Sequence, residues 1–226
     1  MLCATSCAYP SNDEISDDDI LKLSVISTNK ALPADGSSII ELNALIPFNA
    51  DDNKRTVTFN TTDGVFVSTS TKTDQQKVDI TGKAITQLKS TLIPAIIFVS
   101  AELGGYKRTE KIEFIRAYPE KIIVETGIQD YKVKESNYPI VTTKLIRSIG
   151  KSSLNTEANL KAFDASGTNE IGIFKNLTFS NSTGEITANF VLTQLTYRGK
   201  CIIKATVNNT INNSIVSGES SINIVD

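Results

Sequence analysis

From residue 20 to the end of the chain, apolar and polar residues alternate in short runs that are rich in Val, Ile and Thr. Clusters of Gly, Asn, Asp and Ser separate the runs, as turns separate strands. Because side chains alternate between the two faces of a strand, this pattern predicts an all-β protein. Seven strands are expected in the first half, which fits a Greek-key immunoglobulin-like β-sandwich. The expected strands are residues 21–27, 39–46, 55–60, 65–68, 77–80, 95–101 and 109–115.

The chain has 226 residues, which suits two domains of about 100 residues each. A boundary is expected at Ala117–Glu120, because the strand ending at Ile115 is followed by Pro119 and a new run begins at Lys121. The predicted units are an N-terminal tether over 1–19 and domains over 20–116 and 119–226. A linker this short predicts two sandwiches stacked end to end with restricted hinge motion.

An internal repeat supports this division, because four blocks of the first half match four blocks of the second half in the same order. The matched pairs are residues 57–66 with 177–186, 42–44 with 160–162, 96–97 with 202–203, and 111–115 with 221–225. The longest pair shares an apolar-Thr-Phe run, a polar turn, Gly and a second apolar run. Chance similarity among β-rich segments is the alternative explanation.

The segment Pro33-Ala34-Asp35-Gly36-Ser37-Ser38, followed by Val57-Thr58-Phe59 and Gly64, resembles bacterial immunoglobulin-like domains of the invasin and intimin type. The likeness covers most of residues 20 to 116. The second half has a comparable block at 177–179 with Gly184 but lacks the Ala-Asp-Gly segment. The resemblance implies a tandem array of spacer or receptor-presenting modules on a bacterial surface. A shared fold does not imply a shared ligand.

Two of the three cysteines, Cys3 and Cys7, lie close to the N-terminus, and the third is Cys201. Ala4-Thr5-Ser6-Cys7 resembles the end of a bacterial lipobox, in which the cysteine carries the lipid. The basic and apolar segments of such a signal do not stand before it. Residues 8–19 are polar and acidic, which resembles the export signal of Bacteroidetes surface lipoproteins. The resemblance implies lipidation of Cys7, whereas the alternative is an unstructured tail with incidental cysteines.

The amino-acid composition argues against most catalytic mechanisms. The chain has no histidine, which is the commonest general base and metal ligand, and no tryptophan. The acidic residues fall in turns or on the polar phase of strands, so no enzyme activity, metal or cofactor is predicted. Basic and acidic residues nearly balance, at 23 and 25, and no basic stripe indicates nucleic acid as a partner. Contact with a membrane is expected only through a lipid anchor.

The repeat alignment predicts two insertions, over residues 68–93 and 128–152, and loops that differ between repeats are candidates for ligand contact. The second combines aromatic and basic side chains, a composition typical of contact surfaces. Its candidate contact residues are Tyr131, Lys132, Tyr138 and Arg147. The favoured interpretation is nevertheless an extra hairpin that covers a sheet edge, because lysines often protect exposed edges.

Two functions agree with these observations. The first is a non-catalytic spacer or adhesin at the bacterial outer membrane or cell surface, held there by a lipid anchor. The second is a carbohydrate-binding accessory lipoprotein of a glycan-uptake system, with exposed tyrosines contacting the sugar. In both cases the partner is a protein or glycan at the cell surface, and the sequence does not identify it.

Overall fold

The computed structural model describes residues 20–27, 30–47, 55–133 and 138–226, and their regular elements are β-strands. The first domain has two sheets, ordered β1-β3-β7-β5 and β2-β9-β8-β4-β6. Its strands are β1 (Lys22–Ile26), β2 (Ala31–Ala34), β3 (Ile39–Leu45), β4 (Thr56–Thr61), β5 (Val65–Phe66), β6 (Thr73–Lys77), β7 (Lys83–Lys89), β8 (Ala95–Leu103) and β9 (Tyr106–Arg116).

The second domain is a single sheet of eight strands in the order β10-β12-β15-β14-β13-β16-β17-β11, which wraps around its own core. Its strands are β10 (Lys121–Glu125), β11 (Asp130–Lys132), β12 (Ile140–Ile146), β13 (Asn159–Phe163), β14 (Glu170–Lys175), β15 (Glu185–Leu192), β16 (Gly199–Asn209) and β17 (Ser214–Val225). The two halves of the sheet are connected through β14, which pairs with β15 on one side and with β13 on the other.

Each domain has its own apolar core. The first core contains buried residues between Leu21 and Phe114, and the second contains buried residues between Ile122 and Ile224. In each core a phenylalanine is fully buried, Phe59 in the first and Phe190 in the second. Burying a side chain of this size stabilises a fold by about 1.5–3 kcal/mol. Two separate cores therefore stabilise two sandwiches, as the alternating pattern predicts.

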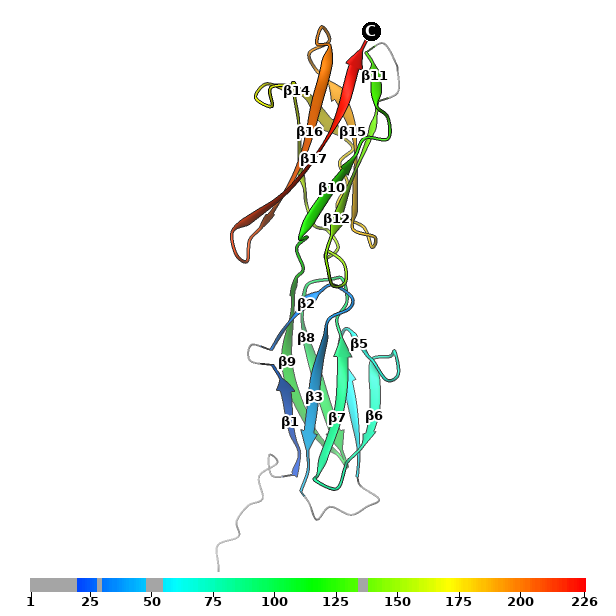
Figure 1. The fold of residues 1–226 in the computed structure, drawn as a ribbon. Coiled ribbons are helices and arrows are strands. Elements are labelled where there is room, and N and C mark those ends of the chain that lie inside the picture. The colour runs from blue at the N-terminus through cyan, green and yellow to red at the C-terminus, as the bar shows by residue number, and fades with distance from the viewer. Residues whose placement is uncertain (1–19, 28–29, 48–54, 134–137) are drawn as a thin grey trace, which may run out of the picture.

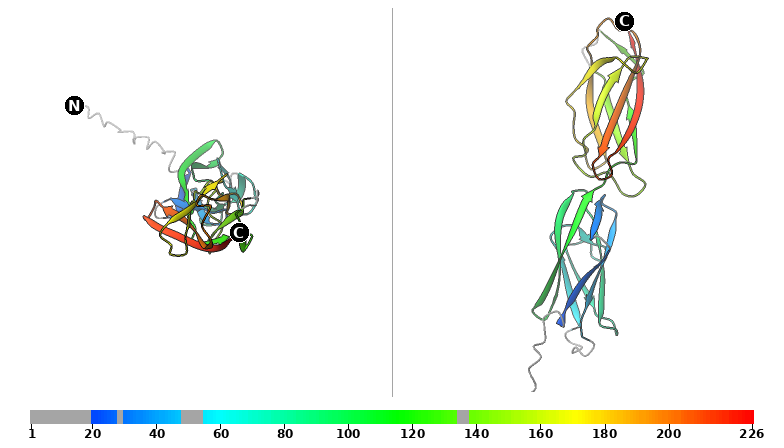
Figure 2. Two further views of the ribbon diagram at one scale, coloured as in Figure 1. Left: turned by 90° about the horizontal axis from the view of Figure 1, so that it is seen from above. Right: turned by 90° about the vertical axis from the view of Figure 1, so that its left-hand side faces the viewer.

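The domains are stacked end to end in an elongated molecule, with the C-terminus at the end remote from the first domain (Figures 1 and 2). Strand β9 ends at Arg116 and strand β10 begins at Lys121, so four residues connect the domains. The hairpin of β16 and β17 extends from the second domain back toward this connection (Figure 1). Its turn contacts the connection through a hydrogen bond of 2.7 Å between the hydroxyl groups of Tyr118 and Thr210.

The two domains are tandem copies of one topology. The neighbours β1-β3-β7 of the first domain correspond to β10-β12-β15 of the second, and β2-β9-β8-β4 correspond to β11-β17-β16-β13. Both copies also contain one short parallel pair, β2 with β9 and β11 with β17. The prediction of two tandem immunoglobulin-like β-sandwiches is confirmed.

The detailed repeat alignment is correct only in its last two blocks, which fall on β8 with β16 and on β9 with β17. The block at 57–66 was matched to the wrong segment. Val57 and Phe59 are fully buried in β4, whereas Leu177 and Phe179 lie outside the strands and are 46% and 56% exposed. The block at 42–44 lies in β3, whose equivalent is β12 rather than β13. Short alternating runs match one another in any register, so local similarity did not identify the equivalent strands.

The two proposed insertions also contain regular strands of the sandwich. Residues 68–93 include β6 and the central strand β7, and residues 128–152 include β11 and β12. In the described part of the second segment β11 and β12 do not form the expected hairpin, because β12 lies between β10 and β15 while β11 pairs with β17 at a sheet edge. The strand expected at 77–80 is mostly a turn, since the carboxylate of Asp79 accepts hydrogen bonds from the Thr81 and Lys83 amides.

Candidate binding cleft beside the domain junction

The loop between β12 and β13, residues 147–158, contacts the first domain through backbone hydrogen bonds. The amide of Lys151 donates to the carbonyl oxygen of Asp35 at 2.9 Å, and the amide of Leu154 donates to that of Leu92 at 2.8 Å. Gly150 makes this approach possible because its φ is 64° and a Cβ there would lie 2.5 Å from the Asp35 carbonyl oxygen. The contact therefore depends on a glycine at this position.

Two side chains complete the junction. Ser153 is fully buried, and its hydroxyl donates to the carbonyl oxygen of Ala34 at 2.8 Å while accepting from the amide of Ala117 at 2.9 Å. Arg116, the last residue of β9, donates through Nη1 to the carbonyl oxygens of Leu154 and Asn155, at 3.2 Å each. Groups from both domains and from the linker thus share one hydrogen-bond network.

The carboxylate of Asp35 is buried at this junction and accepts hydrogen bonds from the amides of Ser37 and Ser38 at 2.8 and 2.7 Å. Burial raises the pKa of Asp35, but the hydrogen bonds from Ser38 and Ser37 and the charge of Arg147 outweigh it, so the net pKa is lowered. Arg147 lies 3.9 Å from this carboxylate and also donates to the carbonyl oxygen of Tyr118. An ionised carboxylate is therefore built into the contact between the domains.

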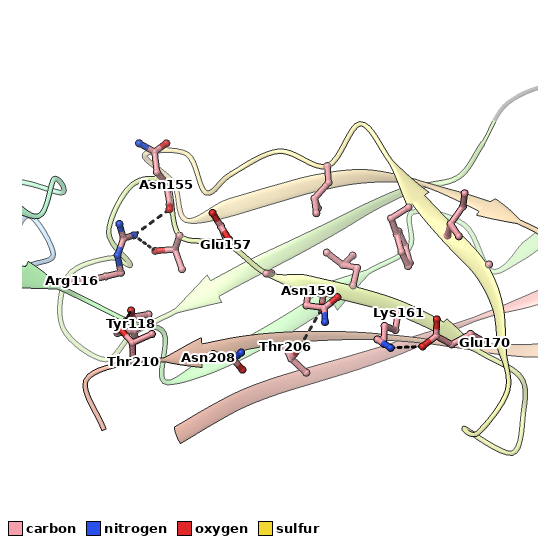
Figure 3. Close-up of a pocket in the computed structure, with 17 residues that line it drawn as sticks. Arg116, Tyr118, Asn155, Glu157, Asn159, Lys161, Glu170, Thr206, Asn208 and Thr210 are labelled. Carbon is pink, nitrogen blue, oxygen red and sulfur yellow. Dashed lines mark hydrogen bonds and ion pairs between the residues drawn. The ribbon is translucent and has the colours of Figure 1, made fainter. Parts of the chain in front are cut away.

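A cleft of about 800 Å³ opens beside the junction on the second domain (Figure 3). One wall is formed by β13 and by residues 155–158 before it, and the other by β14 and the segment that follows it. The walls meet at one end through the pairing of Ala162 with Gly172. At the other end the amide of Ser180 donates to the carbonyl oxygen of Thr156 at 3.1 Å. The cleft is thus a slot between two diverging segments of backbone.

The lining of the slot combines apolar and polar groups. Leu160 and Phe174 are half-buried, while Ile173 and Leu177 are 49% and 46% exposed. Polar side chains of β13 and β16 surround them. These include Asn159, Thr206 and Asn208, together with an ion pair between Lys161 and Glu170 (Figure 3). Such a mixture is typical of sites that bury apolar groups of a ligand and orient its polar groups.

The turn between β13 and β14 fixes the closed end of the slot. The Asp164 carboxylate accepts hydrogen bonds from the Ser166 amide at 3.1 Å and from the Asn169 side chain at 2.6 Å. Hydrogen bonds from the Ser166 and Asn169 side chains lower the pKa of Asp164 to about 2. The carboxylate is therefore ionised at neutral pH and holds the turn in one conformation.

The structure separates the four candidate contact residues that the sequence suggested. Tyr131 is buried at 3% exposure in β11, and its ring packs at 72° to that of Phe190, so it belongs to the core. Lys132 and Tyr138 are exposed, and Arg147 takes part in the domain junction. None of the four lines the cleft. Side chains alternate along β11, so Tyr131 points into the core. Choosing contact residues by composition alone does not use this signal.

Sequence reasoning also missed the residues that form the cleft. Leu160, Ile173 and Leu177 are ordinary apolar residues in a β-rich segment, and no local motif distinguishes them. Their grouping depends on the divergence of β13 from β14, which pair at Ala162 and Phe163 only. A local signal was the apolar-Thr-Phe run at 177–179, which we aligned with a core strand although its side chains are exposed.

The described residues contain no cluster of three or more Cys, His, Asp or Glu that would hold a metal ion. Cys201 is fully buried in β16, and burial raises the pKa of its thiol to about 12. Such a thiol is protonated at neutral pH and is a poor nucleophile. Cys7, the expected lipidation site, and the acidic tether lie outside the described residues.

No protein-family model and no curated protein sequence matches the chain. Solved structures do match in fold. Invasin, described as a bacterial integrin-binding protein, aligns with a TM-score of 0.65 and 16% identity over 90% of this chain and 39% of its own. The adhesin InvE of Yersinia pseudotuberculosis aligns with a TM-score of 0.54 and 14% identity over 93% and 60%.

A tetra-tandem repeat from the extending region of a large adhesion protein aligns with a TM-score of 0.53 and 16% identity, over 91% of this chain and 49% of that one. This chain therefore spans less than two thirds of each of these solved chains. The likeness establishes the fold of tandem immunoglobulin-like domains, which these adhesion proteins share. Among the described residues there is also no helix long and apolar enough to span a membrane.

Proposed function

We propose that this chain is a non-catalytic spacer or adhesin module on a bacterial surface, and that it holds a binding region at a fixed distance from the cell. The observation that carries the proposal is the junction, where loop 147–158 is hydrogen-bonded to the first domain. Domains joined only by a linker reorient freely, whereas this network restricts their relative motion. Two of the fold neighbours, the adhesin InvE and the large adhesion protein with tandem repeats, support the same function.

The proposal includes attachment through a lipid on Cys7, with residues 8–19 as a solvated tether. The tether sequence is acidic and contains few apolar residues. It would join the anchor to the first domain, whose β1 begins at Lys22. The second domain would then point away from the cell surface.

Distance measurements between the domains test the spacer function. Nitroxide labels are placed by Ile80→Cys and Leu195→Cys, two substitutions at side chains that are 84% and 63% exposed, one in each domain. Cys3 and Cys7 are changed to serine, while the buried Cys201 does not react. Pulsed electron paramagnetic resonance is expected to give one narrow distance distribution. A distribution as broad as that of two freely hinged domains would contradict the proposal.

Attachment is tested in cells of the native organism. Metabolic labelling with an alkyne fatty acid is expected to mark the wild-type protein and the Cys3→Ser variant but not the Cys7→Ser variant. Antibody against the folded domains is expected to label intact cells. Lipid incorporation that persists in Cys7→Ser would refute this anchor, and a protein accessible only after lysis would refute the surface location.

A further inference from the structure

The first domain shows what normally lies beside the strand that borders the cleft. Strand β4, the equivalent of β13, is flanked by β8 on one side and by β6 on the other. Strand β6 is five residues long and pairs with Thr56–Asn60 of β4 in antiparallel register. In the first domain, therefore, a five-residue strand of the chain itself covers this sheet edge.

In the second domain the same edge is open. Residues 159–161 of β13 pair with β16 on one side, and the described part of the chain provides no strand on the other. The chain returns to this edge only at the two ends of the slot, at Ala162 and at Thr156. An edge strand presents alternate N–H and C=O groups outward, where another extended segment can pair with them.

The dimensions of the slot suit a short strand. The open part of β13 is residues 159–161, and Glu157 and Ala158 continue the same wall of the cleft, so five residues border this side, or about 16 Å for an extended partner. Four apolar side chains, those of Leu160, Ile173, Phe174 and Leu177, line the slot. A strand laid along β13 would direct one set of alternate side chains toward the face of Phe174 and the other set toward the face of Ile173.

The charged side chains around the slot favour a bound segment with a basic residue. Lys161 and Glu170 neutralise each other at one end, and Arg116 is hydrogen-bonded to the domain junction at the other. Glu157 is exposed and makes no ion pair within the described residues (Figure 3). A basic side chain near the junction end of a bound segment would therefore find an unneutralised carboxylate.

We propose that the slot between β13 and β14 binds an extended segment of about five residues from a partner polypeptide, which pairs with the open edge of β13. The segment has apolar side chains at alternate positions and a lysine or arginine near Glu157. It occupies the place that β6 fills in the first domain. This site is independent of the spacer function, because holding the two domains at a fixed distance does not use the edge of β13.

The probe is a phage-displayed library of random peptides, selected against the full chain. An enriched peptide is synthesised and titrated against three variants. Ile173→Lys and Leu177→Lys each place a charge in the slot at an exposed position, which leaves the fold intact. The matched control is Ile96→Lys, whose parent side chain is 56% exposed on β8 of the first domain.

The two slot variants are expected to weaken binding by about tenfold or more, because an ammonium group is desolvated when the peptide binds. The control is expected to bind like wild type. Glu157→Gln is expected to weaken binding of a basic peptide, with a smaller salt dependence than wild type. Hydrogen exchange should show new protection of those amides of residues 159–161 that face away from β16, which a contact through side chains alone would not produce.

Several outcomes overturn the proposal. These are failure to enrich any peptide, equal binding by the slot variants and the wild type, and protection at another strand instead of β13. A glycan array is probed in parallel. A glycan that loses binding in Ile173→Lys without protecting residues 159–161 would assign the slot to sugars instead. None of these results affects the distance measurement that tests the spacer function.

Discussion

The two domains share one topology but cover the outer edge of β4 and of its equivalent β13 differently. In the first domain, β6 stays beside β4, and the two sheets remain separate. In the second, β14 leaves β13 after two paired residues and joins β15, so that one sheet of eight strands results. In the first domain β6 therefore covers the edge of β4, whereas in the second the edge of β13 borders a cleft. Two copies of one fold thus differ in the chain that follows β4 or β13: β5 and β6 make separately the two pairings that β14 makes alone.

Gly172 is part of the reason that β14 can cross to the other half of the sheet. A Cβ at this position would lie 2.3 Å from the ring of Phe190, so the ring fills the space beside the backbone of β14. Phe190 also contacts Phe174, with ring centroids 5.8 Å apart. The core of the second domain is therefore built around the strand that switches partner.

The largest effect on stability is expected from truncating the buried phenylalanine of each core in turn. Phe190→Ala and Phe59→Ala should each lower the free energy of unfolding of their own domain by about 3–5 kcal/mol. Differential scanning calorimetry should show two transitions, of which only the one belonging to the altered domain moves far. Equal shifts of both transitions in either variant would show that the domains unfold as one unit.

The next largest effect is expected at the glycine of the junction. Gly150→Ala should loosen the contact between the domains, because its Cβ would overlap the Asp35 backbone. The matched control is Gly167→Ala, whose φ of 76° is similar but whose Cβ would meet nothing within 4 Å. Both should lose about 1–2 kcal/mol through backbone strain. Only Gly150→Ala should broaden the distance distribution between labels on the two domains, and equal broadening by both would exclude this contact as its cause.

An effect of similar size is expected at two adjacent buried serines. Ser153→Ala should cost about 1–3 kcal/mol, since it removes the hydroxyl that bridges Ala34 and Ala117. Within the described residues the hydroxyl of Ser152 is buried without a hydrogen-bond partner, so Ser152→Ala should be neutral or slightly stabilising. Chemical denaturation of the two variants measures the difference. A similar loss in both would mean that packing, not the bridge, stabilises the junction.

The smallest effect is expected from pH. The pKa of Asp35 is lowered in the folded protein from its ordinary value of 3.8, so ionised Asp35 contributes stability above that value. This contribution should be lost as the pH falls below 3.8 and through the folded pKa. Thermal unfolding of the first domain, measured from about pH 5 to about pH 2, should depend less on pH in Asp35→Asn than in wild type. Identical slopes would show that other carboxylates account for the acid sensitivity.

Much of the fold was predictable because β structure has a short period. Apolar residues alternate with more exposed ones in β3 and β16, which places them on one face. These alternate residues, Leu42, Ala44, Cys201, Ile203, Ala205 and Val207, are buried. The turn at Gly104-Gly105 was also predictable, because paired glycines favour a tight turn. Both glycines have positive φ and join β8 to β9. Strand β7 was missed although it alternates, since it was assigned to an insertion between repeats.

The candidate cleft was not predictable from these patterns. The contact residues suggested by composition are divided among the core, the junction and the surface, as Tyr131, Arg147 and Tyr138 illustrate. Aromatic and basic residues in one segment indicate an interface only if they share a face. In β11 and β12 successive residues point to opposite sides, so nearness in sequence did not bring them together.

The sequence by itself determined the all-β class and the division into two sandwiches with separate cores, because alternation and turn residues act over a few residues. Only the tertiary structure decided how the copies differ. The bond between Ser153 and Ala34 joins residues 119 positions apart, and the partner of β14 depends on packing against Phe190. Such pairings depend on the free energy of the whole assembled core, and no local pattern of apolar and polar residues encodes it.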